Sequence, residues 1–204
     1  MLEIYSPSGK EEKLAVFLRG ELRSLGFNNV HSDEVGNVYG EVGNSSPVVF
    51  MCGHIDTVPG WIPVRVDDER IYGRGSVDAK SSLAAMVSAA CELGQRNVEG
   101  KVIVAAVVEE ELHSKGIRSL LRKKMMIDYA IFGEPSGAGS ITFAYKGRLG
   151  TKIRCRTETG HVGAQHLYSN AVEEAYGLWN QIRRAFESKK SPRGIFYSTT
   201  SCLT

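Results

Sequence analysis

Three apolar runs limit what this chain can fold into, because none shows the polar alternation of a strand with one face in water. They span Pro47–His54, Val102–Glu111 and Tyr129–Glu134, and each ends in a histidine or a glutamate. Such runs are typical of strands buried on both faces of a parallel sheet. Open α/β sheets bind ligands beyond the carboxyl ends of their strands. We therefore expect His54, Glu109–Glu111 and Glu134 to meet at one sheet edge.

Segments with helical patterns separate these runs. We predict a helix over residues 9–25 that starts at a Ser8–Glu11 capping box and stops at Gly26, a second helix over Leu83–Leu93 and a third from about Ser114 to Lys124. Val35–Val42 adds a strand before the first run. The alternation predicts an α/β fold with a mixed, mostly parallel sheet and helices on both faces.

The pattern changes near Ser136–Ser140. We expect residues 1–138 to form one domain and residues 139–204 part of a smaller α+β domain. In the second, Ile141–Tyr145 and Thr151–Thr157 alternate like strands of a hairpin that turns near 146–148, residues 170–186 read as an amphipathic helix, and a further strand begins at Gly194.

Composition and charge exclude several classes of protein. The chain has 204 residues, 42% of them hydrophobic and 24% charged, with a formal net charge of +2. These values fit a globular protein and do not favour nucleic acid or a membrane as a partner. The N-terminus lacks the features of a signal peptide, and four scattered cysteines without a CxxC pair indicate free thiols. We expect a cytoplasmic protein.

The residue types at the predicted sheet edge suit metal chemistry. One histidine and several carboxylates, without a thiolate, favour divalent ions such as Zn²⁺, Co²⁺ or Mn²⁺. Asp56 is placed to orient the imidazole of His54, and Asp78 follows a glycine-rich loop from which it could bridge two ions. Each motif alone has an ordinary alternative, since a lone histidine after a strand or a run of glutamates is more often structural.

Four motifs in order resemble the signature of a zinc aminoacylase family whose members include acetylornithine deacetylase, succinyl-diaminopimelate desuccinylase and carboxypeptidase G. The motifs are Gly53–Pro59, Gly73–Lys80, Glu109–Glu111 with Ser114–Gly116, and Gly133–Pro135. The resemblance covers essentially the whole chain. It implies a co-catalytic hydrolase with two divalent ions, Zn²⁺ first and Co²⁺ as the alternative, that cuts a linear amide.

The resemblance also implies a role for each site residue. His54, Asp78 and Glu134 would bind one ion, and Asp78 with Glu111 the other. Asp56 would orient His54, and Glu110 would act as general base. The family's usual Asp-Glu-Glu triplet is Glu-Glu-Glu here, so Glu109 with Glu110 is the competing register. Residues 139–204 would be a lid or dimerisation domain in which His161 binds substrate, and the complete enzyme would be a homodimer.

Within the family, Ile4–Gly9, Gly53–Gly60 and Ile62–Arg65 look most similar to the [LysW]-lysine/[LysW]-ornithine hydrolases. That similarity implies an N-acylated amino acid or an amino-group carrier protein as substrate, in lysine or arginine biosynthesis. The family's last metal ligand is a C-terminal histidine, and this chain has none at a matching position. We therefore expect a truncated form with a weak second metal site and little turnover.

Three other functions remain open. The chain could be another N-acyl-amino-acid deacylase or dipeptidase of this family, or a non-catalytic binding protein derived from it. A nucleotide-binding protein is the alternative from a different class, because Gly73 and Gly75 precede a predicted helix. However, a P-loop needs glycine directly before its lysine, and Ala79 precedes Lys80 here.

Overall fold

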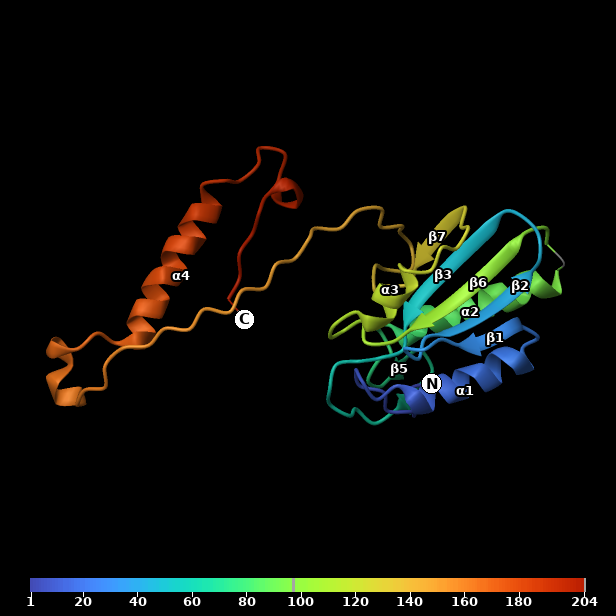
Figure 1. Cartoon of the computed structure of the whole chain (residues 1–204), viewed down its shortest axis with the longest axis horizontal. Helices are drawn as coiled ribbons and strands as arrows, with labels where there is room; N and C mark the ends of the chain where they lie inside the picture. Colours follow the sequence, from blue (N-terminus) through green and yellow to red (C-terminus); the bar gives the residue numbers. More distant parts are fainter. Residues whose placement is uncertain (97, 204) are drawn as a thin grey trace. The chain divides into compact units, whose positions relative to one another are not determined.

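A computed structural model describes residues 1–96 and 98–203, which divide into two compact units, Met1–Ile141 and Thr142–Thr204 (Figure 1). The first unit contains a five-stranded sheet in the order β1-β2-β6-β3-β7. Its strands are β1 (Asn28–Ser32), β2 (Val38–Gly43), β3 (Val48–His54), β6 (Lys101–Val107) and β7 (Tyr129–Phe132). The last three are the predicted apolar runs, so their assignment as strands is confirmed.

The sheet is mixed, and four of its five strands point the same way. β3 is parallel to both β6 and β7, β2 is antiparallel to β6, and β1 is antiparallel to β2. Only β2 therefore runs against the others, which confirms the predicted α/β fold with a mostly parallel sheet. The predicted strand at Val35–Val42 starts later, at Val38, because residues 35–37 form a turn on the Asp33 carboxylate.

Helices cover both faces of this sheet (Figure 1). On one face α1 (Glu12–Ser24) and α2 (Lys80–Gln95) share a core with the strands that includes Leu14, Leu83 and Val104. On the other, α3 (Lys115–Leu120) contributes Leu120 to a second core with Phe50. Side chains of a strand point alternately to its two faces, so both cores require apolar residues from β3 and β6, and these runs show no polar alternation. The burial predicted for the third run is wrong, because β7 is an edge strand and all four of its residues are exposed.

The C-terminal end of α1 agrees with the prediction, and its N-terminal end does not. Gly26 has φ +82° and ends the helix region as expected. The predicted capping box is wrong, because the helix starts only at Glu12 and the Ser8 hydroxyl bonds to Asp56 rather than to the helix. A short two-stranded ribbon, β4 (Arg65–Val66) with β5 (Ile71–Tyr72), lies between β3 and α2 in sequence.

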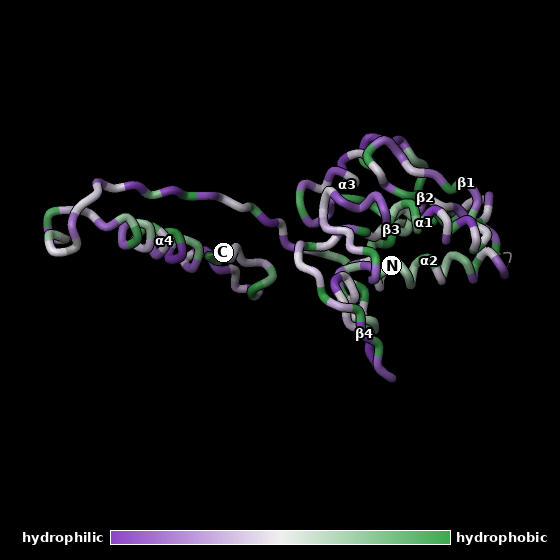
Figure 2. Tube along the Cα trace, turned by 90° about the horizontal axis from the view of Figure 1, so that it is seen from below, coloured by the Kyte–Doolittle hydropathy of each residue, from purple (hydrophilic) through white to green (hydrophobic). Residues whose placement is uncertain are grey.

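The second unit is helical where it is regular. It contains the 3₁₀ helices η1 (Val162–Leu167) and η2 (Ile195–Tyr197) and the longer α4 (Ala171–Glu187). The predicted helix at 170–186 is confirmed, and Asn170 Oδ1 caps it by accepting the Val172 amide at 2.9 Å. Figure 2 shows both hydrophobic and hydrophilic residues along α4. None of the described helices is long and apolar enough to cross a membrane.

The strands predicted in this unit are wrong. Residues 141–145 and 151–157 are irregular, and η2 occupies the segment after Gly194. Phe143 is 97% exposed, so the alternating side chains have no core to face. A two-stranded hairpin is marginal without a third strand or a packed helix, and no strand pairing is present within described residues 142–203.

Candidate metal centre

Three predicted metal ligands lie together at one edge of the sheet. His54 ends β3, Asp78 lies in the loop before α2, and Glu134 follows β7. One donor atom from each lies within 4.8 Å of the others. The parallel register explains why His54 and Glu134 meet: Cys52 pairs with Phe132, so the residues two positions further on reach the same level.

Hydrogen bonds orient the imidazole of His54, which is fully buried. Its Nδ1 lies 2.9 Å from the backbone oxygen of Asp56, and its Nε2 lies 3.0 Å from Asp78 Oδ1. A carbonyl only accepts, so Nδ1 carries a proton and Nε2 faces the cluster. Burial opposes protonation, but the bonds to Asp56 and Asp78 prevail and raise the pKa of His54 to about 9. A cation at Nε2 would replace that second proton.

The Asp56 carboxylate lies beside His54, which we predict it to orient, and it also bonds to other parts of the site. Its Oδ1 is 3.4 Å from His54 Nδ1, longer than the carbonyl contact. The two oxygens accept the backbone amides of Glu110 and Glu111 at 3.0 Å each, and Oδ2 also accepts the Ser8 hydroxyl at 2.7 Å. Burial opposes ionisation of Asp56, but the contact with His54 and then the bonds from Ser8, Glu110 and Glu111 lower its pKa. Asp56 thus joins the ends of β3 and β6.

The glutamate triplet forms a turn directly after β6. Glu109 has φ +52°, and its carboxylate lies 3.8 Å from Lys115 Nζ. Glu111 is outside the set of donor atoms within 4.8 Å. Burial and then the negative charge of Asp78 raise the pKa of Glu111. The pKa of Glu134 is also raised, by burial and by the charges of Glu110, Asp78 and Glu111. The structure thus gathers carboxylates whose charges oppose one another.

The loop that carries Asp78 is fixed by Lys80. This lysine is 2% exposed, and its Nζ donates to the backbone oxygens of Ile4 at 2.9 Å and Met1 at 3.4 Å. Burial lowers the pKa of Lys80 to about 8. Gly75, with φ +87°, approaches Lys80 so closely that a Cβ there would lie 3.0 Å from Lys80 Cδ. The Asp78 side chain itself remains 53% exposed.

The donor set fits a divalent cation. It offers one imidazole nitrogen and two carboxylates, ligands that Zn²⁺ and Co²⁺ accept. Desolvation and mutual repulsion of the carboxylates disfavour their ionised forms, and a cation would relieve both. The Cys52 thiol is not part of this donor set, and burial and then the charge of Glu134 raise its pKa to about 12.

Sequence reasoning missed three side chains that support the site. Ser8, Glu11 and Asn37 hold the Asp56 carboxylate or the turn after β6. The sequence predicts a helix cap for Ser8 and Glu11, because a cap has the same local spacing. The burial of Glu11, only 6% exposed beside an exposed Glu12, distinguishes it from an ordinary first-turn acid.

His161 belongs to the second unit. It precedes η1, and its Nδ1 accepts a hydrogen bond from the Gly163 amide at 3.0 Å. Its predicted part in substrate binding stays a prediction.

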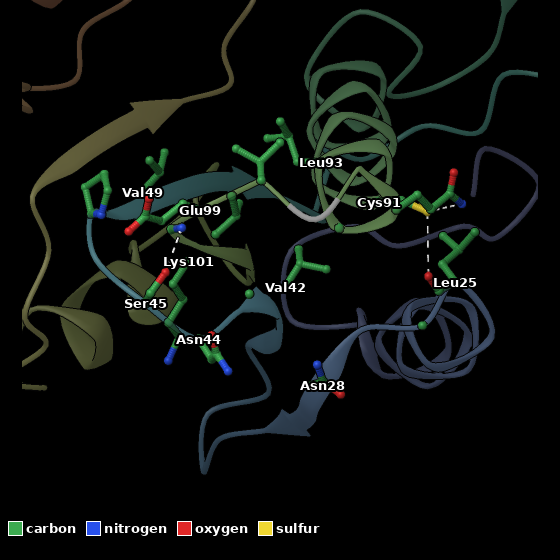
Figure 3. A pocket seen from close by; sticks show the side chains of 18 residues that line it. Leu25, Asn28, Val42, Asn44, Ser45, Val49, Cys91, Leu93, Glu99 and Lys101 are labelled. Atoms are coloured by element: carbon green, nitrogen blue, oxygen red, sulfur yellow. Dashed lines mark hydrogen bonds between the residues drawn. The ribbon is translucent and has the colours of Figure 1, made fainter.

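Two cavities in the first unit lie outside the cluster. One of about 690 Å³ is at the amino ends of β3 and β6, opposite the site, and Figure 3 shows Val49 and Lys101 at its wall. Another of about 700 Å³ borders the turn after β6 and is lined by Glu109, His113 and Arg118 among others. Neither contains His54, Asp78 or Glu134.

Comparisons with known proteins agree on one family. Residues 50–200 match the peptidase family M20/M25/M40. A Pyrococcus abyssi protein, provisionally named [LysW]-lysine/[LysW]-ornithine hydrolase, is 40% identical over 187 residues, which cover 92% of this chain and 52% of that protein. The [LysW]-lysine hydrolase of Deinococcus radiodurans is 38% identical over 185 residues, 89% of this chain and 50% of that enzyme.

The chain therefore spans about half the length of the curated relatives it matches. Among solved structures, the M20 family metallo-carboxypeptidase Sso-CP2 of Sulfolobus solfataricus has a TM-score of 0.57 at 24% identity, over 64% of this chain and 35% of that one. This likeness shows a shared fold.

Proposed function

Because this chain belongs to the peptidase family M20/M25/M40, we propose that it is part of a metal-dependent hydrolase that cuts a linear amide and releases lysine or ornithine. Two observations support the substrate: relatives at 40% and 38% identity carry the names [LysW]-lysine/[LysW]-ornithine hydrolase and [LysW]-lysine hydrolase. The acyl group would be the end of an amino-group carrier protein or a simpler N-acyl group, and the reaction would serve lysine or arginine biosynthesis.

We assign His54, Asp78 and Glu134 to one ion and Asp78 with Glu111 to a second, with Zn²⁺ as the first expectation and Co²⁺ as the alternative. When bound, such ions polarise a substrate carbonyl and lower the pKa of a water molecule. Among the described residues, His54 is the only histidine of the three-residue cluster. The second ion would therefore depend on carboxylates alone, and we expect it to bind weakly.

Glu110 is our candidate for the proton-transfer group. It would take a proton from the attacking water and return it to the nitrogen of the departing amine. Its backbone is fixed by Asp56 at 3.0 Å, and Glu110 and Glu111 both raise the pKa of Glu134 through their charges. These observations support Glu110 as the base and Glu111 as the metal ligand. They disfavour the alternative assignment to Glu109 and Glu110, because the Glu109 carboxylate faces Lys115.

We further propose that residues 1–138 belong to the catalytic domain and 139–204 to a lid or dimerisation domain in which His161 binds substrate. Helix α4 exposes three large apolar side chains, Val172, Tyr176 and Leu178, which a second copy could cover. They support a homodimer of the complete enzyme, which sedimentation velocity would test. The four cysteines, all unpaired, support a cytoplasmic location.

The observation that carries the proposal is the meeting of His54, Asp78 and Glu134 within 4.8 Å. The test is a calorimetric titration of the purified chain with Zn²⁺ and Co²⁺, followed by an assay for lysine released from N-acyl-lysine. We expect tight binding of one ion and little turnover. Turnover at a rate normal for complete enzymes would refute the expectation of little turnover. Tight ATP or NAD binding without metal binding would favour a nucleotide-binding protein.

A further inference from the structure

Four consecutive backbone amides after β6 donate to side chains from three distant segments. Val108 N–H donates to Asn37 Oδ1 at 3.0 Å and Glu109 N–H to Glu11 Oε1 at 3.1 Å, while the next two amides donate to Asp56. Buried amides need partners, and in a turn after a strand no neighbouring strand supplies them. The direction in which Glu110 and Glu111 leave the sheet thus depends on these side chains.

Glu11 is the member of this set that has no assigned role. It is 6% exposed, and its Oε1 accepts the Gly9 amide at 2.9 Å as well as the Glu109 amide. No ion pair of Glu11 is present within the described residues. A buried carboxylate is costly unless hydrogen bonds satisfy it, so Glu11 is held in place by the amides it accepts.

The amide that Glu11 accepts belongs to a residue in an unfavourable conformation. Glu109 has φ +52°, which non-glycine residues adopt only when their surroundings impose it. One anchor is the bond from Ser114 N–H to Glu109 O at 2.6 Å, and the other is Glu11. Without Glu11, the Glu109 N–H would lose its hydrogen-bond acceptor, and the turn would lose one of these two anchors.

The segment that carries Glu11 is itself tied to the loop after β3. Ser6 Oγ donates to the Ile55 oxygen at 2.7 Å, Thr57 N–H to the Ser6 oxygen at 3.0 Å, and Ser8 N–H to the Thr57 oxygen at 3.2 Å. Ser8 Oγ then reaches the Asp56 carboxylate at 2.7 Å. Glu11 and Ser8 thus act on the same turn, one directly and one through Asp56.

We propose that Glu11 is a positioning residue of the metal centre, which sets the turn that presents Glu110 and Glu111, and that Ser8 supports it by steadying Asp56. This inference rests on the proposed function. Outer partners of metal-binding groups influence affinity by about 10- to 100-fold in known sites.

The experiment compares the wild-type chain with Glu11→Ala, Glu11→Gln and, as a matched control, Glu12→Ala. Glu12 is the neighbouring exposed acid in the first turn of α1. Two quantities are measured: hydrogen exchange of the amides of residues 108–111 without metal, and Co²⁺ affinity with the visible spectrum of the bound ion. Thermal unfolding of each variant shows whether the fold is kept.

We expect Glu11→Ala to exchange these amides faster than wild type and to bind Co²⁺ about tenfold more weakly with an altered spectrum. Glu11→Gln keeps an oxygen acceptor and should stay close to wild type, as should Glu12→Ala. If Glu11 had only a structural role, Glu11→Ala would lower the melting temperature, but Glu11→Gln would not restore wild-type amide exchange and the wild-type Co²⁺ spectrum.

The outcomes separate the two proposals. If the wild-type chain binds no divalent ion, the proposed function fails. If the wild type binds Co²⁺ and Glu11→Ala binds it equally well with unchanged exchange, the role of Glu11 alone is refuted. Should Glu11→Ala not fold, Ser8→Ala decides the matter: faster exchange at Glu110 and Glu111 supports positioning through this segment, and wild-type exchange overturns it.

Discussion

Asp56 Oδ1 lies 3.0 Å from the backbone nitrogen of Glu110, a residue 54 positions further along the chain. The same carboxylate accepts the Glu111 amide, and the Asp56 backbone oxygen accepts from the His54 ring. One residue thus fixes a proposed metal ligand and the two glutamates of the proposed site relative to each other. Metal binding by His54, as proposed here, would therefore be coupled to the geometry of the turn after β6.

Asp56→Asn should weaken metal binding. The asparagine amide group would face an N–H of Glu110 or Glu111 where a carboxylate oxygen now accepts it, so the turn would shift. We expect the Zn²⁺ affinity to fall by about 10- to 100-fold, measured by competition with a chromogenic chelator. Asp67→Asn is the control, because Asp67 also accepts two backbone amides but in the exposed β4–β5 turn. Equal affinities in the two variants would contradict this coupling.

Glu134→Gln should have opposite effects with and without metal. Burial raises the pKa of Glu134, so its charge is unfavourable in the metal-free fold, and the variant should melt at the same temperature as wild type or higher. The rise in melting temperature on adding Zn²⁺ should be lost, because a ligand is removed. Scanning fluorimetry measures both effects. Glu158→Gln, at an exposed position of the second unit, should keep the full Zn²⁺ response.

Gly116→Ala should destabilise the first unit. A Cβ on Gly116 would overlap Asn37 Oδ1 and lie 2.6 Å from the Val108 oxygen, both parts of the support for the turn after β6. We expect a loss of about 1–3 kcal/mol in the free energy of unfolding, measured in urea. Gly20→Ala, on an open position of α1, should instead stabilise by about 0.5–1 kcal/mol. Similar effects of the two substitutions would refute the close-contact explanation.

Asp33 should make the first unit sensitive to acid. Burial opposes its ionisation, but hydrogen bonds from Lys123 and Tyr39 prevail and hold its pKa below the ordinary 3.8. A lowered folded pKa means that the stabilisation is complete above the unfolded pKa and is lost as pH falls through the folded pKa.

Asp33→Asn should therefore lower the unfolding free energy at neutral pH by about 1–3 kcal/mol, because hydrogen-bond acceptors for buried donors are lost. The difference from wild type should shrink below pH 3.8, which urea unfolding from pH 7 to pH 2 would show. Asp68→Asn, at an exposed position, should change neither the unfolding free energy at neutral pH nor its dependence on pH. A difference that stayed constant with pH would rule out this account.

Much of the first unit could be predicted because its local signals agree with its tertiary environment. The runs that end at His54 and lead to Glu111 are buried on both faces, so hydrophobicity alone marks them as strands. The run that leads to Glu134 is also a strand, but its residues are exposed at the edge of the sheet, so hydrophobicity predicted the strand and not its burial. Strands that share a direction bring their carboxyl ends to one edge, which is why His54 and Glu134 could be expected to meet.

Other features depended on partners that local patterns do not reveal. The alternation in residues 141–157 predicted strands, but a strand forms only where another strand or a core receives it. Ser8 and Glu11 have the spacing of a helix cap, yet they bond to Asp56 and Glu109 instead. Their hydrogen-bond groups have several possible partners, and distant segments decide which one is close.

By itself the sequence determined the α/β class, the buried strands β3 and β6 and the residue types of a candidate divalent-metal site, because periodicity and ligand chemistry are local properties. Only the tertiary structure decided that the Asp56 carboxylate accepts the Glu110 amide and that the Asp56 carbonyl contacts the His54 ring. It also decided that Glu11 accepts the Glu109 amide. Hydrogen bonds act over about 3 Å, so they form between groups that the fold, and not the order of residues, brings together.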